Sequence, residues 1–166
     1  MGKTMMPLVF SLALLLNGCA IFTKGDRYPR EIDRHYEGML NDSTYAESDA
    51  RFIEYADSSK VLVSYSVKLE RPLEKVEAEG YPEGAAIKDG KIFSRGVPYD
   101  GLPDRVYVKV ICPNGKEGTI RRECGFTAIG VPQGDDCVAK NCVAKKHDEI
   151  LDQIYAALML AAGKEN

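Results

Sequence analysis

The sequence of 166 residues contains no tryptophan, only two histidines and no excess of positive charge. Lysine and arginine together number 22, against 25 aspartates and glutamates, which gives a formal net charge of −3. A chain with this balance lacks the basic surplus that neutralises phosphates, so we expect no nucleic-acid partner. With 45% hydrophobic and 28% charged residues, the composition is that of one modest globular domain.

Signatures of catalysis and metal binding are also missing. No serine lies in a G-x-S-x-G elbow, and no H-E-x-x-H or phosphate-loop pattern occurs. Charged residues flank both His35 and His147, and we expect both at the surface. The glutamate-rich segment 73–84 could supply a carboxylate pair, although such a run is more often a solvated face. We therefore predict a protein that is not an enzyme, with no catalytic residue, no cofactor and no metal.

No hydrophobic run is long enough to span a membrane as a helix. The N-terminal apolar segment Pro7–Leu16 has ten residues, whereas a helix across the bilayer core needs about 20. Lys3 precedes this segment, and Asn17-Gly18-Cys19 follows it. A positive residue, a short apolar run and small residues in this order are typical of an export signal.

The stretch Leu16-Asn17-Gly18-Cys19 resembles the lipobox of bacterial lipoproteins, in which leucine and a small residue precede an obligatory cysteine. The resemblance covers only the signal region and implies lipidation of Cys19 with cleavage just before it. The mature chain would then have 148 residues (166 − 18). Two or more acyl chains hold a protein stably on a membrane, so the bilayer itself is an expected partner.

The same resemblance implies a place in the cell envelope. The residue after the cysteine is Ala20, not the aspartate that retains many such lipoproteins in the inner membrane. We expect the protein at the periplasmic face of the outer membrane, with the inner membrane as the alternative. The chain then divides into a signal peptide (1–18), a lipidated tether (19–29) and one domain (30–166). Since the tether reaches at most about 30 Å, the domain should lie near the membrane.

Four further cysteines are Cys112, Cys124, Cys137 and Cys142. An even number in an exported chain favours two disulfides, because the periplasm is oxidising. Their spacing does not fit a zinc site well, but zinc and free thiols remain alternatives. The favoured pattern is 112–124 with 137–142. Both crossed patterns stay open, because an Asn-Gly turn at 114–115 would separate Cys112 from Cys124.

Hydrophobic spacing predicts the secondary structure. Apolar residues at helical intervals indicate helices over 30–41 and 45–57, the second with a Thr44–Glu47 capping box. Alternation of apolar and polar residues indicates strands, and one apolar stripe indicates a C-terminal amphipathic helix. The expected strands cover 61–70, 105–112 and 118–129, a small hairpin surrounds Asp89-Gly90, and the last helix covers 146–162.

These elements predict an α+β fold. We expect a small antiparallel sheet with N-terminal helices and a C-terminal amphipathic helix packed on it, stapled by disulfides. Residues 73–104 are rich in glycine and proline and give the least regular pattern.

An anchored domain without catalytic motifs favours the binding of another envelope protein, as in assembly, secretion-system, exclusion or immunity lipoproteins. The candidate contact residues lie on one strand and on the last helix: Arg121, Arg122, Tyr155, Leu158 and Met159. A cell-wall or glycan-binding module using Tyr81, Tyr99 and Tyr107 is the alternative, and a carboxylate-dependent envelope hydrolase is a third reading.

Overall fold

The computed structural model describes residues 27–80, 85–88, 91–94, 102, 105–123, 126–131 and 137–163, with only the backbone described in 85–94. Cys19 and Cys124 lie outside these residues, as do Tyr81, Tyr99 and the Asp89-Gly90 turn. The elements are β1 (Arg30–Asn41), β2 (Thr44–Glu54), β3 (Lys60–Arg71), β4 (Glu74–Gly80), β5 (Ala85–Lys88), β6 (Lys91–Ser94), β7 (Arg105–Ile111), β8 (Glu117–Glu123), β9 (Phe126–Gly130) and α1 (Cys137–Ala161). Over the described ranges, no helix is long and apolar enough to cross a membrane.

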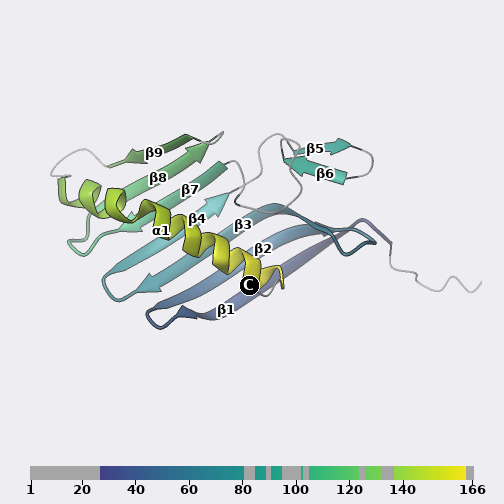
Figure 1. Cartoon of the computed structure of the whole chain (residues 1–166), viewed down its shortest axis with the longest axis horizontal. Helices are drawn as coiled ribbons and strands as arrows, with labels where there is room; N and C mark the ends of the chain where they lie inside the picture. Colours follow the sequence, from purple (N-terminus) through teal and green to yellow (C-terminus); the bar gives the residue numbers. More distant parts are fainter. Residues whose placement is uncertain are drawn as a thin grey trace, which may run out of the picture.

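Seven of the strands form one antiparallel sheet in the order β1-β2-β3-β4-β7-β8-β9. Helix α1 lies diagonally across one face of this sheet (Figure 1). Strands β5 and β6 pair only with each other and form a separate small hairpin, as the sequence predicts around 89–90. The expectation of an α+β fold with a C-terminal helix on an antiparallel sheet is thus confirmed.

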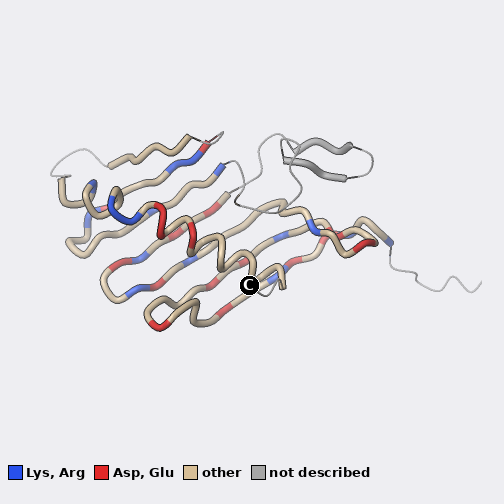
Figure 2. The backbone as a smooth tube through the Cα atoms, viewed as in Figure 1, with Lys and Arg blue, Asp and Glu red and all other residues tan. Residues whose placement is uncertain are grey.

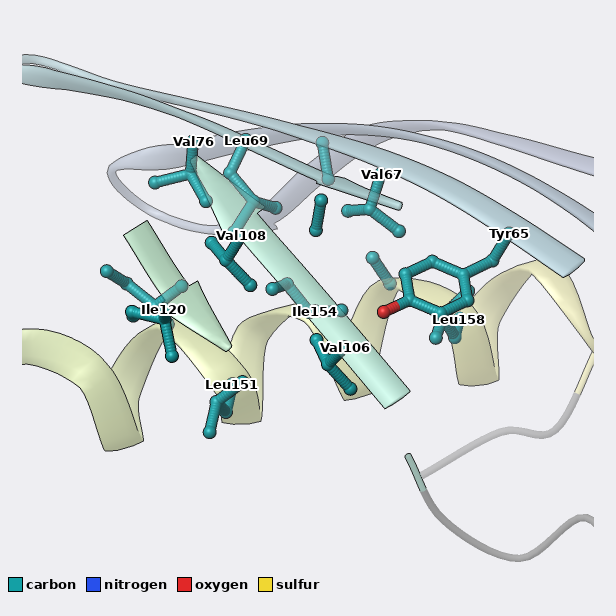
Figure 3. Close-up of a cluster of buried hydrophobic side chains, with 14 of the residues drawn as sticks. Tyr65, Val67, Leu69, Val76, Val106, Val108, Ile120, Leu151, Ile154 and Leu158 are labelled. Atoms are coloured by element: carbon teal, nitrogen blue, oxygen red, sulfur yellow. The ribbon is translucent and has the colours of Figure 1, made fainter. Parts of the chain in front are cut away.

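The hydrophobic core lies between α1 and the sheet face beneath it, which we call the covered face. Alternate residues of β3, β4, β7 and β8 point toward the helix, whose own apolar stripe completes the core. Figure 3 shows this cluster, with Tyr65, Val67, Leu69, Val76, Val106, Val108, Ile120, Leu151, Ile154 and Leu158 labelled.

The predicted N-terminal helices over 30–41 and 45–57 are wrong, because both segments are strands. Residues 32, 36 and 40 recur at intervals of four, which places them on one face of a helix but also on one face of a strand. Their neighbours at 34 and 38, Arg34 and Gly38, carry no hydrophobic side chain to reveal a period of two. Thr44 is a buried residue at the start of β2, not a helix cap.

Two further strands differ from the sequence-based prediction. The segment predicted as one strand over 118–129 is two, β8 and β9, which pair antiparallel with Glu123 opposite Phe126. Strand β4 lies in the segment that gave no regular pattern, although Glu74, Val76 and Ala78 are buried and alternate with exposed residues. Because two of these inward positions carry a glutamate and an alanine, the alternation of buried and exposed residues does not appear as an alternation of hydrophobic and polar residues in the sequence.

The β7–β8 turn follows the Asn-Gly signal. Gly115 has φ of +76°, which favours glycine, and its N–H donates to the carbonyl of Cys112 at 2.8 Å. The Cys112 N–H donates to the carbonyl of Lys116 at 2.9 Å, and Asn114 Oδ1 accepts from the Lys116 N–H at 3.1 Å. The turn is therefore tight, and it places Ile111 directly opposite Glu117.

Helix α1 begins at Cys137, nine residues before the predicted start at 146, and ends at Ala161 beside Gly163, whose φ is +73°. The extra turns bury Ala139 and Val143 against the sheet. Gly118 permits this contact, because a Cβ built there would lie 2.2 Å from Cγ2 of Val143. On β2 the buried side chains at Ala46, Ser48 and Ala50 are small, whereas Phe52 contributes a large one to the same core.

Polar contacts hold the helix near its middle and at its C-terminal end. The buried carboxylate of Glu74 lies 3.0 Å from Nη2 of Arg71 and 2.9 Å from Nζ of Lys146 in α1. Arg71 also reaches Oε1 of Glu149 at 2.6 Å. At the C-terminal end, Lys60 Nζ donates to the carbonyl of Ala162 at 2.8 Å. A buried carboxylate needs such partners, since an unpaired one would cost several kcal/mol.

Leu158→Asp tests the role of α1. Leu158 is fully buried, so the aspartate would place an unpaired charge in the core and leave a cavity, at a cost of about 4 kcal/mol or more. We expect loss of the cooperative unfolding transition in circular dichroism and chemical denaturation.

Val138→Asp is the matched control on the same helix. Val138 is 57% exposed and lies in the first turn, where a negative charge suits the helix dipole. We expect its unfolding free energy to stay within about 0.5 kcal/mol of wild type. A stably folded Leu158→Asp protein would contradict the packing of α1 on the sheet.

Candidate binding surface

Helix α1 covers only one face of the seven-stranded sheet, and we call the opposite side the open face. Residues of both charge signs lie along its strands (Figure 2). Several of them pair across neighbouring strands on the β1–β3 side, including Asp33 with Arg51 at 2.8 Å and Glu47 with Lys68 at 3.0 Å. Such exposed pairs contribute little to stability but neutralise each other.

The centre of the open face is hollowed. A depression of about 510 Å³ extends over β3, β4, β7 and β8. The open-face side chains that line it are Ser66, Lys68, Glu77, Glu79, Tyr107, Lys109, Thr119 and Arg121. The side chains that line the depression are thus polar or charged, and their aliphatic and aromatic parts also contribute to its surface.

One end of the open face carries aromatic and basic side chains together, and we call it the β7–β9 corner. Its members are Arg105, Tyr107, Arg121, Glu123 and Phe126, which the strand register places on the open face. The Tyr107 hydroxyl donates to Oε1 of Glu123 at 3.0 Å, and Arg105 Nε lies 3.4 Å from the same oxygen. Arg121 bonds the other oxygen of Glu123, and Phe126 is 80% exposed at the edge strand.

These contacts fix the charge state of the corner. The hydrogen bond from Arg121, followed by that from Tyr107, lowers the pKa of the Glu123 carboxyl. Burial and the bond to Glu123 raise the pKa of the Tyr107 hydroxyl, so it remains a donor at neutral pH. The guanidinium of Arg105 also stands over the Tyr107 ring, 5.8 Å from its centre. The corner therefore has two cations, one anion and two exposed aromatic rings.

Arg121 and Arg122, both predicted as partner contacts, point to opposite faces. They are successive residues of β8, and side chains alternate along a strand. Arg121 faces the open side with Tyr107, whereas Arg122 lies opposite Val106 and Thr127 on the helix side. Neither is on the edge of the sheet, because β9 lies outside β8. Only Arg121 belongs to the corner.

The candidate contacts on α1 are mostly inside the core. Leu158 is fully buried and Met159 is 8% exposed, so neither is available to a partner. Tyr155 is half-buried. Eight consecutive apolar residues in the last part of the helix are thus explained by packing on the sheet.

The remaining polar candidates are dispersed. His35 is exposed on β1, where its Nδ1 lies 2.9 Å from Asp49, and this bond raises its pKa. His147 lies in α1, where its Nε2 is 2.9 Å from Oδ1 of Asp148. Among the described side chains, no three metal-binding groups come together. Of the glutamates in 73–84, Glu74 is buried in the ion-pair cluster, whereas Glu77 and Glu79 lie on the open face.

The predicted disulfide pattern is not seen. Cys112, Cys137 and Cys142 are free thiols in the structure. A 137–142 bond does not fit, because both residues lie in α1 five positions apart, where the helix geometry holds the Cα atoms about 8–9 Å apart. The register also opposes 112–124. Glu123, the neighbour of Cys124, pairs with Arg105 at the end of the β7–β8 hairpin opposite to Cys112. The side chains of Cys112 and Cys142 instead approach to 2.6 Å.

Comparisons with known proteins give no relative. No family model, no curated protein and no solved structure matches the chain.

Proposed function

We propose that this protein is a lipid-anchored envelope lipoprotein whose domain binds another protein through the β7–β9 corner, without catalysing a reaction. The observation that carries this proposal is the uncovered corner, where Tyr107, Phe126 and Arg121 stand together on the open face. Aromatic and arginine side chains are the residue types that dominate protein-binding energetics. With two arginines and one glutamate, the corner suits a partner surface that offers carboxylates.

The position of the corner relative to the tether supports this use. Arg105 and Glu123 pair near the end of the sheet at which β1 starts, so the corner and Arg30 lie at the same end, at opposite edges (Figure 1). If Cys19 is lipidated, the short tether holds that end near the bilayer. Confinement of both partners to one membrane raises their effective concentration, so a modest interface suffices.

A glycan-binding module is the second candidate, because exposed Tyr107 beside Arg121 could also stack on and bond a sugar ring. Of the three tyrosines considered for this role, only Tyr107 belongs to the described residues. Binding of purified peptidoglycan fragments that Tyr107→Ala abolishes, with no protein captured, would favour this candidate.

Arg121→Ala and Arg122→Ala form a matched pair for the protein-binding proposal. In affinity capture from the native envelope, we expect Arg121→Ala to lower recovery of the partner by about tenfold or more, the range of an interface arginine. Arg122→Ala, which changes the other face, should capture normally. Equal loss in both variants, or in neither, would contradict binding at the corner.

Phe126→Ala and Leu73→Ala form a second pair. Both side chains are large, apolar and exposed, at 80% and 70%, but Leu73 lies in the β3–β4 turn at the other end of the sheet. Neither change should shift the melting temperature by more than a degree or two. We expect only Phe126→Ala to reduce capture, and a larger effect of Leu73→Ala would move the interface to that end.

Cys19→Ala tests the anchor. We expect the wild-type protein to be extracted from membranes with residues 1–18 removed and lipid mass on Cys19, as measured by intact-protein mass spectrometry. The variant should remain an unprocessed precursor or become soluble. A Cys19→Ala protein that is processed and bound to membranes as tightly as wild type would overturn the lipoprotein proposal.

A further inference from the structure

Two cysteines that are 30 positions apart in the sequence meet under helix α1. Cys112 follows β7 directly and is buried on the covered face, where its Sγ lies 3.6 Å from the carbonyl of Ala139 in α1. Cys142 lies one helical turn further along α1 and is half-buried. Their side chains approach to 2.6 Å. The fold thus places one thiol from the sheet against one from the helix.

The surroundings of this pair are those of a structural cysteine site. Cys142 Sγ also lies 3.7 Å from Oε2 of Glu74, whose other oxygen is bonded to Lys146. Burial, and then the contacts with Cys112 and Glu74, raise the pKa of the Cys142 thiol to about 12. Because the thiolate is the nucleophile, this thiol is unsuited to covalent catalysis in the folded protein. Its proximity to Cys112 is therefore better explained by a permanent bond than by a reactive site.

We propose that Cys112 and Cys142 form a disulfide that ties α1 to the end of β7 in the exported protein. The two thiols lose two protons and two electrons as the sulfur–sulfur bond forms. A donor disulfide, such as that of an envelope thiol oxidase, accepts them by thiol–disulfide exchange and leaves as two thiols. Cys142 attacks the donor before α1 packs fully on the sheet, because burial in the folded protein raises the pKa of its thiol, and Cys112 then resolves the mixed disulfide.

The bond would stabilise the contact on which the core depends. It closes a loop of about 30 residues that contains β8, β9 and the first turns of α1, and loops of this size give substantial stabilisation in the chain-entropy model. It also acts on the same stretch of helix as the Glu74–Lys146 ion pair. This inference rests on the proposed export, because a disulfide persists only in an oxidising compartment.

Tryptic digestion without reduction distinguishes the pairings. Cys112 falls in peptide 110–116 and Cys142 in peptide 141–145, whereas Cys124 and Cys137 share peptide 123–140. After free thiols of the detergent-extracted native lipoprotein are blocked, we expect one mass that joins 110–116 to 141–145. A mass joining 123–140 to either other peptide would overturn the proposal, and so would recovery of 110–116 and 141–145 unlinked and alkylated.

Substitutions give a second readout. Reduction should lower the melting temperature of the wild-type protein by roughly 10 °C, given the size of the loop. Cys112→Ala and Cys142→Ala should melt at a temperature that reductant does not change. Cys137→Ala is the matched control, because Cys137 is exposed at the start of α1, and its melting temperature should fall on reduction as in wild type. A wild-type protein insensitive to reductant would count against the bond.

The result separates this inference from the proposed function. A lipidated, processed protein with reduced Cys112 and Cys142 would refute the disulfide and leave the lipoprotein proposal intact. If Cys19 is unmodified in the cell, the purified full chain is oxidised with glutathione disulfide. Formation of the same 110–116 to 141–145 link would confirm the pairing that the fold dictates, and its absence would refute it.

Discussion

The packing of a single helix on one face of the sheet is the constraint on which the rest of this structure depends. Seven strands at about 4.8 Å spacing give a sheet about 29 Å wide, and 25 helical residues give a rod about 37 Å long. A diagonal helix of this length can contact strands from β9 to β1. A helix over 146–162 alone, about 26 Å long, would leave the β8–β9 side of the core uncovered. The length of α1 is therefore matched to the width that it must bury.

Since one helix covers one face, each strand divides its side chains between two environments. The covered face holds Val106, Val108 and Ile120, all excluded from water, whereas Tyr107 and Arg121 on the same strands face the open side. Changes on the covered face therefore act on stability, whereas changes on the open face alter the surface that we propose for recognition. Arg121 and Arg122 are an example, because these adjacent residues of β8 lie on opposite faces of the sheet.

The sequence predicts most strongly those elements whose periodicity is complete. Strand β3 alternates without interruption from Tyr65 to Leu69, and the last turns of α1 carry an unbroken apolar stripe, so both are predicted correctly. Strands β1 and β2 are not, because small residues occupy inward positions: Gly38, where a Cβ would lie 3.1 Å from the hydroxyl of Tyr36, and Ala46 and Ala50 in the core. These inward positions therefore lack the large hydrophobic side chains by which a strand is recognised in a sequence.

The predicted contact residues and the proposed corner overlap only in part, for a related reason. Arg121 is among the predicted contact residues, but Phe126 is not, because its place beside Glu123 depends on the antiparallel pairing of β8 with β9 inside 118–129. Leu158 and Met159 are buried in the structure, and the sequence does not reveal this because an apolar helix face has the same composition whether it meets a partner or a sheet. The pairing of strands, not their composition, decides which residues share a surface.

The two ends of the sheet have different surroundings if Cys19 carries lipid. Arg30 starts β1 at the end where Arg105, Glu123 and Phe126 lie, and the turns at 41–44, 72–73 and 112–116 lie at the other end. The tether reaches at most about 30 Å from the bilayer to β1, and the corner lies about one sheet width from β1. The corner therefore stays within roughly the sum of these two distances from the bilayer. A partner at the corner would be reached most readily if it is itself a membrane protein or membrane-anchored. A soluble partner would gain nothing from the placement of this surface, so the geometry favours recognition at the membrane itself.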